Sequence, residues 1–274
     1  MHAAGIASAR FDTEILLSHV ANKDRAWLIT HMYDTLTDET IEAFESAVRR
    51  RIQREPLQYI VGKQEFWALD FIVTPDVLIP RPETELAVEW ALTVVGPTNK
   101  HVTIVDLCTG SGCIAVSLAS ALGKSRIFAT DKSAKALSVA RINASNHGVS
   151  DRVLFLEGDL FQPLESLDIR CGVDIIVSNP PYVPSGDSRT LQPEVRDYEP
   201  AMALIAGPQG IEMHEKILKA APDYLKPRGT LIMEMGLGQA NMLVEMIRAS
   251  DAYTTPAVHR DLAGIERVVI ARKA

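Results

Sequence analysis

The chain has 274 residues, of which 47% are hydrophobic, and a formal net charge of −7. The acidic balance argues against a nonspecific nucleic-acid coat, which needs a basic surface, and the apolar runs are shorter than the ~20 residues of a membrane span. We therefore expect no membrane segment. Three cysteines are too few for a disulfide framework, and an odd number fits a reducing compartment, so we expect a cytoplasmic protein. We also expect no metal site.

Residues 1–56 are predicted to form a small helical domain. The apolar residues within 11–20 recur at helical spacing. A later helix begins after Thr37 or Asp38, either of which is a good N-cap, and carries acids in its first turn and arginines in its last. We interpret its arginine run as a solvated helix end rather than a phosphate-binding patch; the run is Arg49, Arg50, Arg51 and Arg54.

Residues 57–79 switch to short β-type runs, which predict a hairpin that connects the helical domain to the remainder, residues 80–274. The remainder opens with "PRPETELAVEWAL", where a proline and two glutamates mark the start of a helix. From residue 101 apolar runs alternate with helical stretches, which predicts an α/β fold with a mostly parallel, doubly wound sheet. The runs are "HVTIVDL", "SRIFATD", "RVLFLEGD", "VDIIVSN" and "GTLIMEM".

The stretch "VDLCTGSGCIA" leads from a predicted strand into a helix. Gly110, Gly112 and Ala115 fit the pattern G-x-G-x-x-A, and Asp131 ends the next strand. This spacing is typical of dinucleotide-binding folds, where glycines let the backbone approach the ligand and the acid binds ribose hydroxyls. At this point nicotinamide binding remains an alternative.

Two further acids favour a different cofactor. Asp106 precedes the glycines, and Asp159 ends the third strand. The whole spacing resembles that of the S-adenosylmethionine-dependent methyltransferases with a Rossmann-like sheet. The resemblance implies that the glycine loop holds the methionine portion of the cofactor, that Asp131 binds the ribose and that Asp159 lies near the adenine.

The tetrapeptide Asn179-Pro180-Pro181-Tyr182 follows the fourth predicted strand. Each proline fixes its φ angle and lacks an N–H, so the loop is stiff. The Asn179 side chain and a backbone carbonyl offer two acceptors at a fixed distance, which suits one planar NH2 group, and Tyr182 can lie along a flat group. An amide nitrogen is a poor nucleophile, so the main task is to hold it in line with an electrophilic methyl group.

This tetrapeptide resembles the (N/D)PP(Y/F) signature of amino-methyltransferases, which act on adenine in DNA, guanine in RNA or glutamine in protein. Three other stretches are more specific: 56–85, 194–210 and 261–272. With the two loops they closely resemble the release-factor glutamine methyltransferases, the HemK/PrmC family, over nearly the whole chain. The resemblance implies in-line N5-methylation of the GGQ-loop glutamine of peptide-chain release factors 1 and 2, with S-adenosylhomocysteine as by-product.

The resemblance also assigns site residues. Asn179 and the Pro180 carbonyl would bind the substrate amide, Tyr182 would pack on it, and Pro181 completes this substrate-binding loop. Many family members have glycine at position 108 and an aromatic residue at position 160. The residues expected to line the cofactor are Cys108, Thr109, Gly110, Ser111, Gly112, Asp131, Asp159, Leu160 and Asn179.

The alternatives predict different sequences. A methyltransferase that acts on an exocyclic amine of DNA or RNA would share the tetrapeptide, but it should carry a target-recognition domain or a basic face. A dehydrogenase has no evident use for the tetrapeptide, and an inactive adaptor should have damaged motifs. We therefore expect a monomeric enzyme whose helical domain docks the release factor, without stable binding of nucleic acid.

Overall fold

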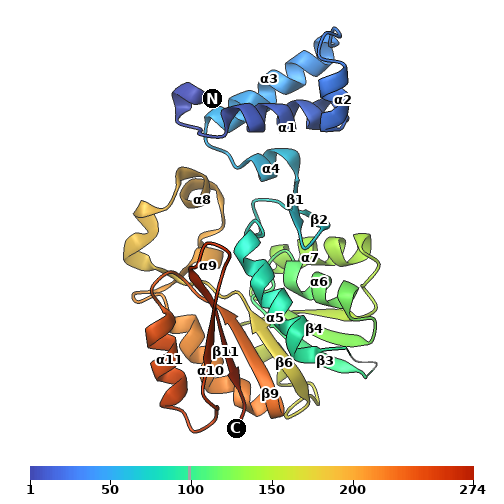
Figure 1. Ribbon diagram of the computed structural model, residues 1–274. Coiled ribbons are helices and arrows are strands. Elements are labelled where there is room, and N and C mark those ends of the chain that lie inside the picture. Colours follow the sequence, from blue (N-terminus) through green and yellow to red (C-terminus); the bar gives the residue numbers. More distant parts are fainter. Residues whose placement is uncertain (98–99) are drawn as a thin grey trace. The chain divides into compact units, whose positions relative to one another are not determined.

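The computed structural model describes residues 1–97 and 100–274 (Figure 1). These residues form two compact units: residues 1–63 with 191–199, and residues 64–190 with 200–274. Within the described ranges no helix has both the length and the apolar character needed to cross a membrane.

The first unit is helical. Leu16, Ala47 and Ile60 form its buried centre, whereas Phe11, which the helical spacing placed near the apolar face, is 51% exposed. Residues 57–61 are a helix, although the sequence predicted β structure there. The elements of this unit are η1 (His2–Ala4), α1 (Ala9–Ala21), α2 (Arg25–Thr30), α3 (Asp38–Ile52), α4 (Leu57–Val61) and α8 (Pro193–Tyr198).

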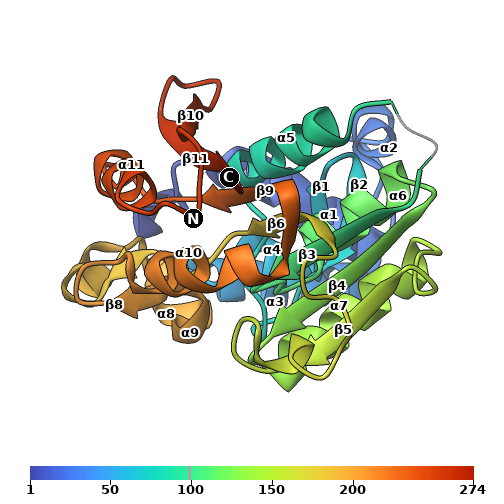
Figure 2. The same cartoon turned by 90° about the horizontal axis from the view of Figure 1, so that it is seen from below.

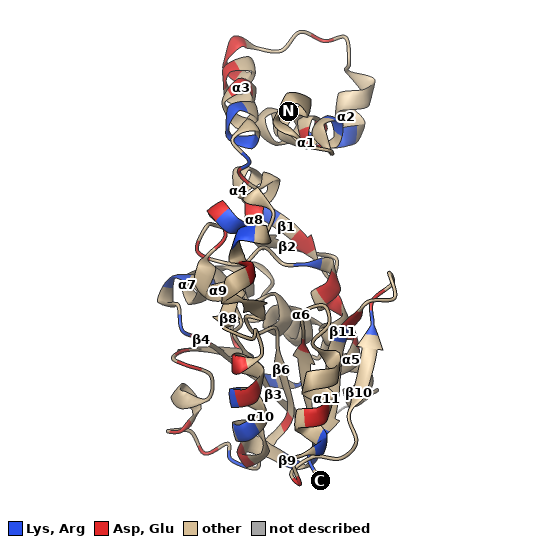
Figure 3. Cartoon of the chain, turned by 90° about the vertical axis from the view of Figure 1, so that its left-hand side faces the viewer, with Lys and Arg blue, Asp and Glu red and all other residues tan. Residues whose placement is uncertain are grey.

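Helix α3 begins and ends as its sequence predicts. The Thr37 hydroxyl caps it by accepting a 3.3 Å hydrogen bond from the Thr40 N–H. Figure 3 shows acidic residues at the start of α3 and arginines at its end, an arrangement that complements the helix dipole.

The interpretation of the arginine run as a solvated helix end is wrong for Arg51. Its side chain is buried and forms ion pairs with Asp12, at 2.7 Å, and with Glu194 of α8, at 3.1 Å. Arg54 pairs with the same glutamate at 2.6 Å. The run therefore joins α1 and α8 to α3 within the helical unit, while Arg49 stays exposed.

The second unit contains the predicted parallel sheet. Seven strands lie in the order β10-β11-β9-β6-β3-β4-β5, and all neighbours from β9 to β5 pair in parallel. The two pairings of β11, with β10 and with β9, are antiparallel, so β11 runs opposite to the parallel strands. The strands are β3 (Val102–Leu107), β4 (Ser125–Asp131), β5 (Val153–Glu157), β6 (Val173–Ser178), β9 (Leu225–Glu234), β10 (Ala257–Arg260) and β11 (Glu266–Arg272).

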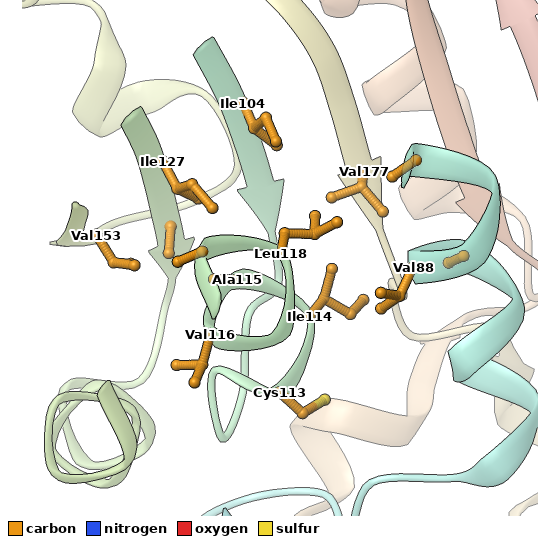
Figure 4. Packing of buried hydrophobic residues seen from close by; sticks show 14 of the residues in the cluster. Val88, Ile104, Cys113, Ile114, Ala115, Val116, Leu118, Ile127, Val153 and Val177 are labelled. Carbon is orange, nitrogen blue, oxygen red and sulfur yellow. The ribbon is translucent and has the colours of Figure 1, made fainter. Parts of the chain in front are cut away.

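Helices cover both faces of this sheet, because successive strand residues point to opposite sides. Ile104 of β3 packs into the layer under α5, α6 and α7, whereas its neighbour Val105 packs toward α10 and α11. Figure 2 shows the sheet between the helices, and Figure 4 shows side chains of β3, β4, β5 and β6 gathered with those of α5 and α6. The helices are α5 (Glu85–Val95), α6 (Cys113–Ala121), α7 (Ala134–Asn146), α10 (Glu212–Tyr224) and α11 (Ala240–Arg248).

Short elements complete the second unit. The predicted hairpin is formed by β1 and β2, and the Asn143 side chain of α7 holds β2 by hydrogen bonds of 2.8 and 3.0 Å to the backbone of Ile72. Strands β7 and β8 pair in parallel as a separate two-stranded sheet. The short elements are β1 (Lys63–Phe66), β2 (Leu69–Ile72), η2 (Pro82–Thr84), η3 (Gln162–Leu164), β7 (Val183–Pro184), η4 (Ser185–Thr190), α9 (Ala201–Leu204) and β8 (Ile205–Gly207).

Candidate active site

A cavity of about 250 Å³ lies at the carboxyl ends of the parallel strands. The chain moves outward through β3, β4 and β5 and then returns to the other side of β3 with β6, so the strand order reverses there. Such a reversal opens a crevice in which doubly wound folds bind ligands. From the loops that follow these strands, the lining includes Cys108, Gly110, Thr130, Asp131, Gly158, Asp159, Leu160, Asn179 and Pro181.

The glycine loop contributes two kinds of position. Gly110 lines the cavity with φ +56°, and a Cβ there would meet no protein atom within 4 Å. Gly112 has φ +80° and caps α6, and its Cβ would lie 3.0 Å from the Ala140 Cβ. Gly110 thus leaves open space on the cavity side, while Gly112 allows α6 and α7 to pack closely. Thr109 and Ser111 are buried behind the lining.

Asp131 connects two of these loops. One carboxylate oxygen accepts a 2.8 Å hydrogen bond from the Gly110 N–H, and the other accepts a 2.9 Å bond from the Ser133 N–H. Burial raises the pKa of this carboxyl, and the residue lines the cavity. Each oxygen retains lone-pair capacity for hydroxyl donors of a ligand.

Asp106 supports the glycine loop from below. Its side chain is fully buried and accepts hydrogen bonds from the Thr109 hydroxyl, at 2.6 Å, and from the Ala115 N–H, at 3.2 Å. Burial raises the pKa of the Asp106 carboxyl to about 7. Through these two hydrogen bonds Asp106 fixes the conformation of the glycine loop.

The predicted adenine end is less enclosed. The Asp159 side chain is 40% exposed and lies 3.5 Å from the Lys132 ammonium group. Leu160 is buried, with φ +51°, and Cys108 has φ +59°. Left-handed backbone is uncommon for such residues, so both positions adopt a conformation that glycine reaches at lower cost.

Two of the four tetrapeptide residues line the cavity, and the other two do not. Asn179 and Pro181 line the cavity, whereas Pro180 and Tyr182 do not. The Asn179 amide nitrogen donates a 3.0 Å hydrogen bond to the Thr84 hydroxyl oxygen. The Tyr182 carbonyl accepts a 2.8 Å bond from the Gln239 side chain, and the Tyr182 hydroxyl donates to Glu234 at 3.4 Å.

Several site residues were not predicted from the sequence. Residues 76–78 and the segment 200–216 supply much of the remaining cavity wall, including Met202, Ile205 and Lys216. Residues 76–78 and 200–210 lie within the stretches 56–85 and 194–210 that carry the family resemblance, but the resemblance did not assign them to the cavity. Glu234 did carry a signal, because it is an acid near the end of the otherwise apolar strand "GTLIMEM".

Family comparisons agree with this fold. Residues 1–62 match the family described as "PrmC N-terminal domain", and residues 98–266 match the family described as "Methyltransferase domain". Among solved structures, the catalytic domain of hMettl16 has a TM-score of 0.60 with 17% identity, and the match covers 85% of this chain and 81% of that one. This likeness supports the methyltransferase fold.

Curated relatives are more similar. The release factor glutamine methyltransferase of Geobacter sulfurreducens is 44% identical over 271 residues, which cover 98% of this chain and 91% of that protein. The release factor glutamine methyltransferase of Moorella thermoacetica is 40% identical over 269 residues, which cover 98% and 93%. With both of its regions matched, the chain belongs to the release factor glutamine methyltransferase family and is an S-adenosylmethionine-dependent methyltransferase.

Proposed function

We propose that this enzyme methylates the side-chain amide nitrogen of the GGQ-loop glutamine in bacterial peptide-chain release factors. The observation that carries the proposal is the Asn179 amide at the cavity wall. Its NH2 group donates to Thr84 inside the protein, so its oxygen is the side-chain atom that can accept an N–H from a ligand. A planar primary amide such as that of glutamine supplies this donor.

The lining fits the cofactor. S-adenosylmethionine supplies a methyl group on a positively charged sulfonium, which is electrophilic without an acid catalyst. The bare face of Gly110 leaves room for a ligand beside the loop, the Asp131 carboxylate can accept ribose hydroxyls, and Leu160 and Pro181 offer apolar surface for a flat base. In this proposal residues 108–112 lie along the methionine portion, and Asp159 lies near the adenine.

The substrate side of the site acts by positioning. Asn179 Oδ1 and the Pro180 carbonyl would accept the two N–H groups of the glutamine amide and hold its nitrogen in line with the methyl donor. The same acceptors stabilise the positive charge that develops on nitrogen during transfer. The S–CH3 bond breaks as the N–CH3 bond forms, S-adenosylhomocysteine leaves, and the surplus N–H proton passes to water. Burial and the nearby Glu234 raise the pKa of Tyr182, so its hydroxyl stays protonated and its ring packs on the amide rather than acting as a base.

We also assign docking of the release factor to the helical unit, none of whose described residues belongs to the cavity lining. A free glutamine side chain makes few contacts, so binding energy must come from the surrounding release-factor fold. In this proposal the enzyme acts as a monomer in the cytoplasm, where translation ends.

Labelled S-adenosylmethionine tests the proposal. The protein is incubated with a purified release factor, with a version whose GGQ glutamine is alanine, and with duplex DNA, and the label is located by mass spectrometry. Label on the GGQ glutamine alone supports the assignment. Label on DNA, or on both release-factor versions alike, would leave a methyltransferase with a different substrate.

A further inference from the structure

A buried carboxylate lies behind the tetrapeptide. Glu234 ends β9 and is 1% exposed. Its Oε1 atom accepts the Tyr182 hydroxyl at 3.4 Å, while Oε2 has no hydrogen-bond partner among residues 1–97 and 100–274. A buried carboxylate with an unsatisfied oxygen is costly for stability, which points to a role in the site.

No ion pair neutralises this carboxylate within the described ranges. Arg267 lowers the pKa of Glu234, but its guanidinium pairs with Asp261 at 3.0 Å. Glu83 adds a second negative charge to the surroundings. Glu234 therefore relies on hydroxyl donors, which are the side chains of Tyr182 and Thr84.

Thr84 connects Glu234 to the tetrapeptide. It is 2% exposed and lies just before α5. Its hydroxyl oxygen accepts from the Asn179 amide at 3.0 Å, and a hydrogen bond from the same hydroxyl lowers the pKa of Glu234. A hydroxyl has one proton, and a carboxylate is a stronger acceptor than an amide oxygen. The proton of Thr84 is therefore directed toward Glu234.

This direction decides how the Asn179 amide is turned. When Thr84 donates to Glu234, its oxygen can only accept from Asn179, so the NH2 group of that amide faces inward and its oxygen remains for the ligand. If Thr84 instead donated to Asn179, the amide would turn and present NH2 to the NH2 of the substrate. Two donors would then face each other, and the substrate nitrogen would lose an acceptor.

We propose that Glu234 is a positioning residue that acts through Thr84 to orient the Asn179 amide and through its hydrogen bond to Tyr182 to orient that ring. The proposal rests on the amide-holding role proposed above for the tetrapeptide. Glu234 touches neither the substrate nor the cofactor in this scheme. It sets the hydrogen-bond direction of the groups that do.

The test compares Glu234→Gln, Thr84→Val, the double variant and Thr84→Ser. Turnover, KM for S-adenosylmethionine, KM for the release factor and Tm are measured for each. Glu234→Gln and Thr84→Val should each lower kcat by about tenfold to a hundredfold, with KM for S-adenosylmethionine nearly unchanged. Thr84→Ser keeps the hydroxyl and should retain most of the activity. The double variant should be no slower than the slower single one, since both changes act through one amide.

Tyr253→Phe is the matched control. It removes a buried tyrosine hydroxyl that bonds to the Leu218 carbonyl at 2.7 Å, away from the cavity lining. This variant should have a lower Tm than the wild type and an unchanged kcat. A buried hydrogen bond that serves only folding is expected to behave in this way.

The outcomes separate the two proposals. If Glu234→Gln and Thr84→Val keep the wild-type kcat while Asn179→Ala loses it, the positioning role is overturned and the amide-holding role stands. Independent, additive losses in the double variant would also overturn the coupling through Thr84. If the wild-type protein does not label the GGQ glutamine, the proposed function fails, and the role of Glu234 fails with it.

Discussion

The Gly110 N–H donates a 2.8 Å hydrogen bond to the Asp131 carboxylate, so the acid that ends β4 holds the loop that follows β3. The second oxygen of Asp131 accepts from the Ser133 N–H at 2.9 Å. One side chain thus fixes two loop backbones and also lines the cavity. Its loss should disturb the shape of the site as well as its hydrogen-bonding capacity.

Asp131→Ala should weaken binding of S-adenosylmethionine by about tenfold to a hundredfold, because it removes ribose acceptors and releases Gly110. Isothermal titration calorimetry measures the change. Asp151→Ala is the control, since the Asp151 side chain is 78% exposed. Unchanged affinity in Asp131→Ala would remove the ribose role from this residue.

The two glycines of the loop should respond differently to alanine. Gly112→Ala adds a Cβ 3.0 Å from the Ala140 Cβ at φ +80°, and should lower the free energy of unfolding by about 1–3 kcal/mol. Gly110→Ala meets no protein atom within 4 Å, so only its φ of +56° adds strain, about 1 kcal/mol. Its larger effect should be on cofactor affinity. Urea unfolding measures the stability of both variants, and calorimetry measures their affinity for the cofactor. Equal stability and equal affinity in the two variants would contradict this prediction.

The sequence was sufficient for the sheet, because the strands are short apolar runs and each is followed by a helix or a loop with a clear signal. It was insufficient at residues 57–61, where "LQYIV" has β-type composition but forms α4. Ile60 packs into the centre of the helical unit, and Gly62 ends the helix with φ +80°. Tertiary burial outweighs local propensity there.

The candidate site likewise contains residues that the sequence predicts and residues that it does not. Motif spacing placed Gly110, Asp131 and Asn179, which the structure brings to one cavity. It gave no separate role to Thr84, which bonds to Asn179, a residue 95 positions away along the chain. It also missed the wall from residues 200–216, because ordinary apolar residues become lining only through the way the chain returns to the sheet.

Arg51→Ala should destabilise the helical unit by about 3 kcal/mol or more, because Asp12 would remain buried at 3% exposure without its partner. Arg49→Ala is the matched control from the same run. Its pair with Glu45 is exposed, so the cost should stay below about 0.5 kcal/mol. Hydrogen exchange in α1 and α3 would report both changes, and equal protection in the two variants would exclude a special role for Arg51.

Asn179→Ala should lower kcat about a hundredfold or more, because the acceptor that holds the substrate amide is lost. Binding of S-adenosylmethionine should change much less, since Asn179 is one of many lining residues. Turnover with the release factor and calorimetric titration of the cofactor give the two quantities. Equal losses in both would assign Asn179 to cofactor binding rather than to the substrate amide.

Glu234 should make stability depend on pH. Burial raises its pKa to about 7 from an ordinary value of 4.5, against the effects of Thr84 and Arg267 and with a contribution from Glu83. Between these pH values the unfolded chain has lost the proton that the folded protein still binds. The free energy of unfolding should therefore fall as pH rises from about 4.5 to 7, by at most about 3 kcal/mol from this group, and the loss should persist above pH 7.

Glu234→Gln isolates this contribution, because glutamine does not titrate and has a similar shape. Asp106, whose pKa is also raised to about 7, affects both proteins alike. In urea unfolding between pH 4.5 and 8, the stability of wild type relative to Glu234→Gln should decline with rising pH and then level off. Parallel curves would mean that Glu234 titrates at its ordinary pKa, and the carboxylate would then need a stronger partner than the two hydroxyls that face it.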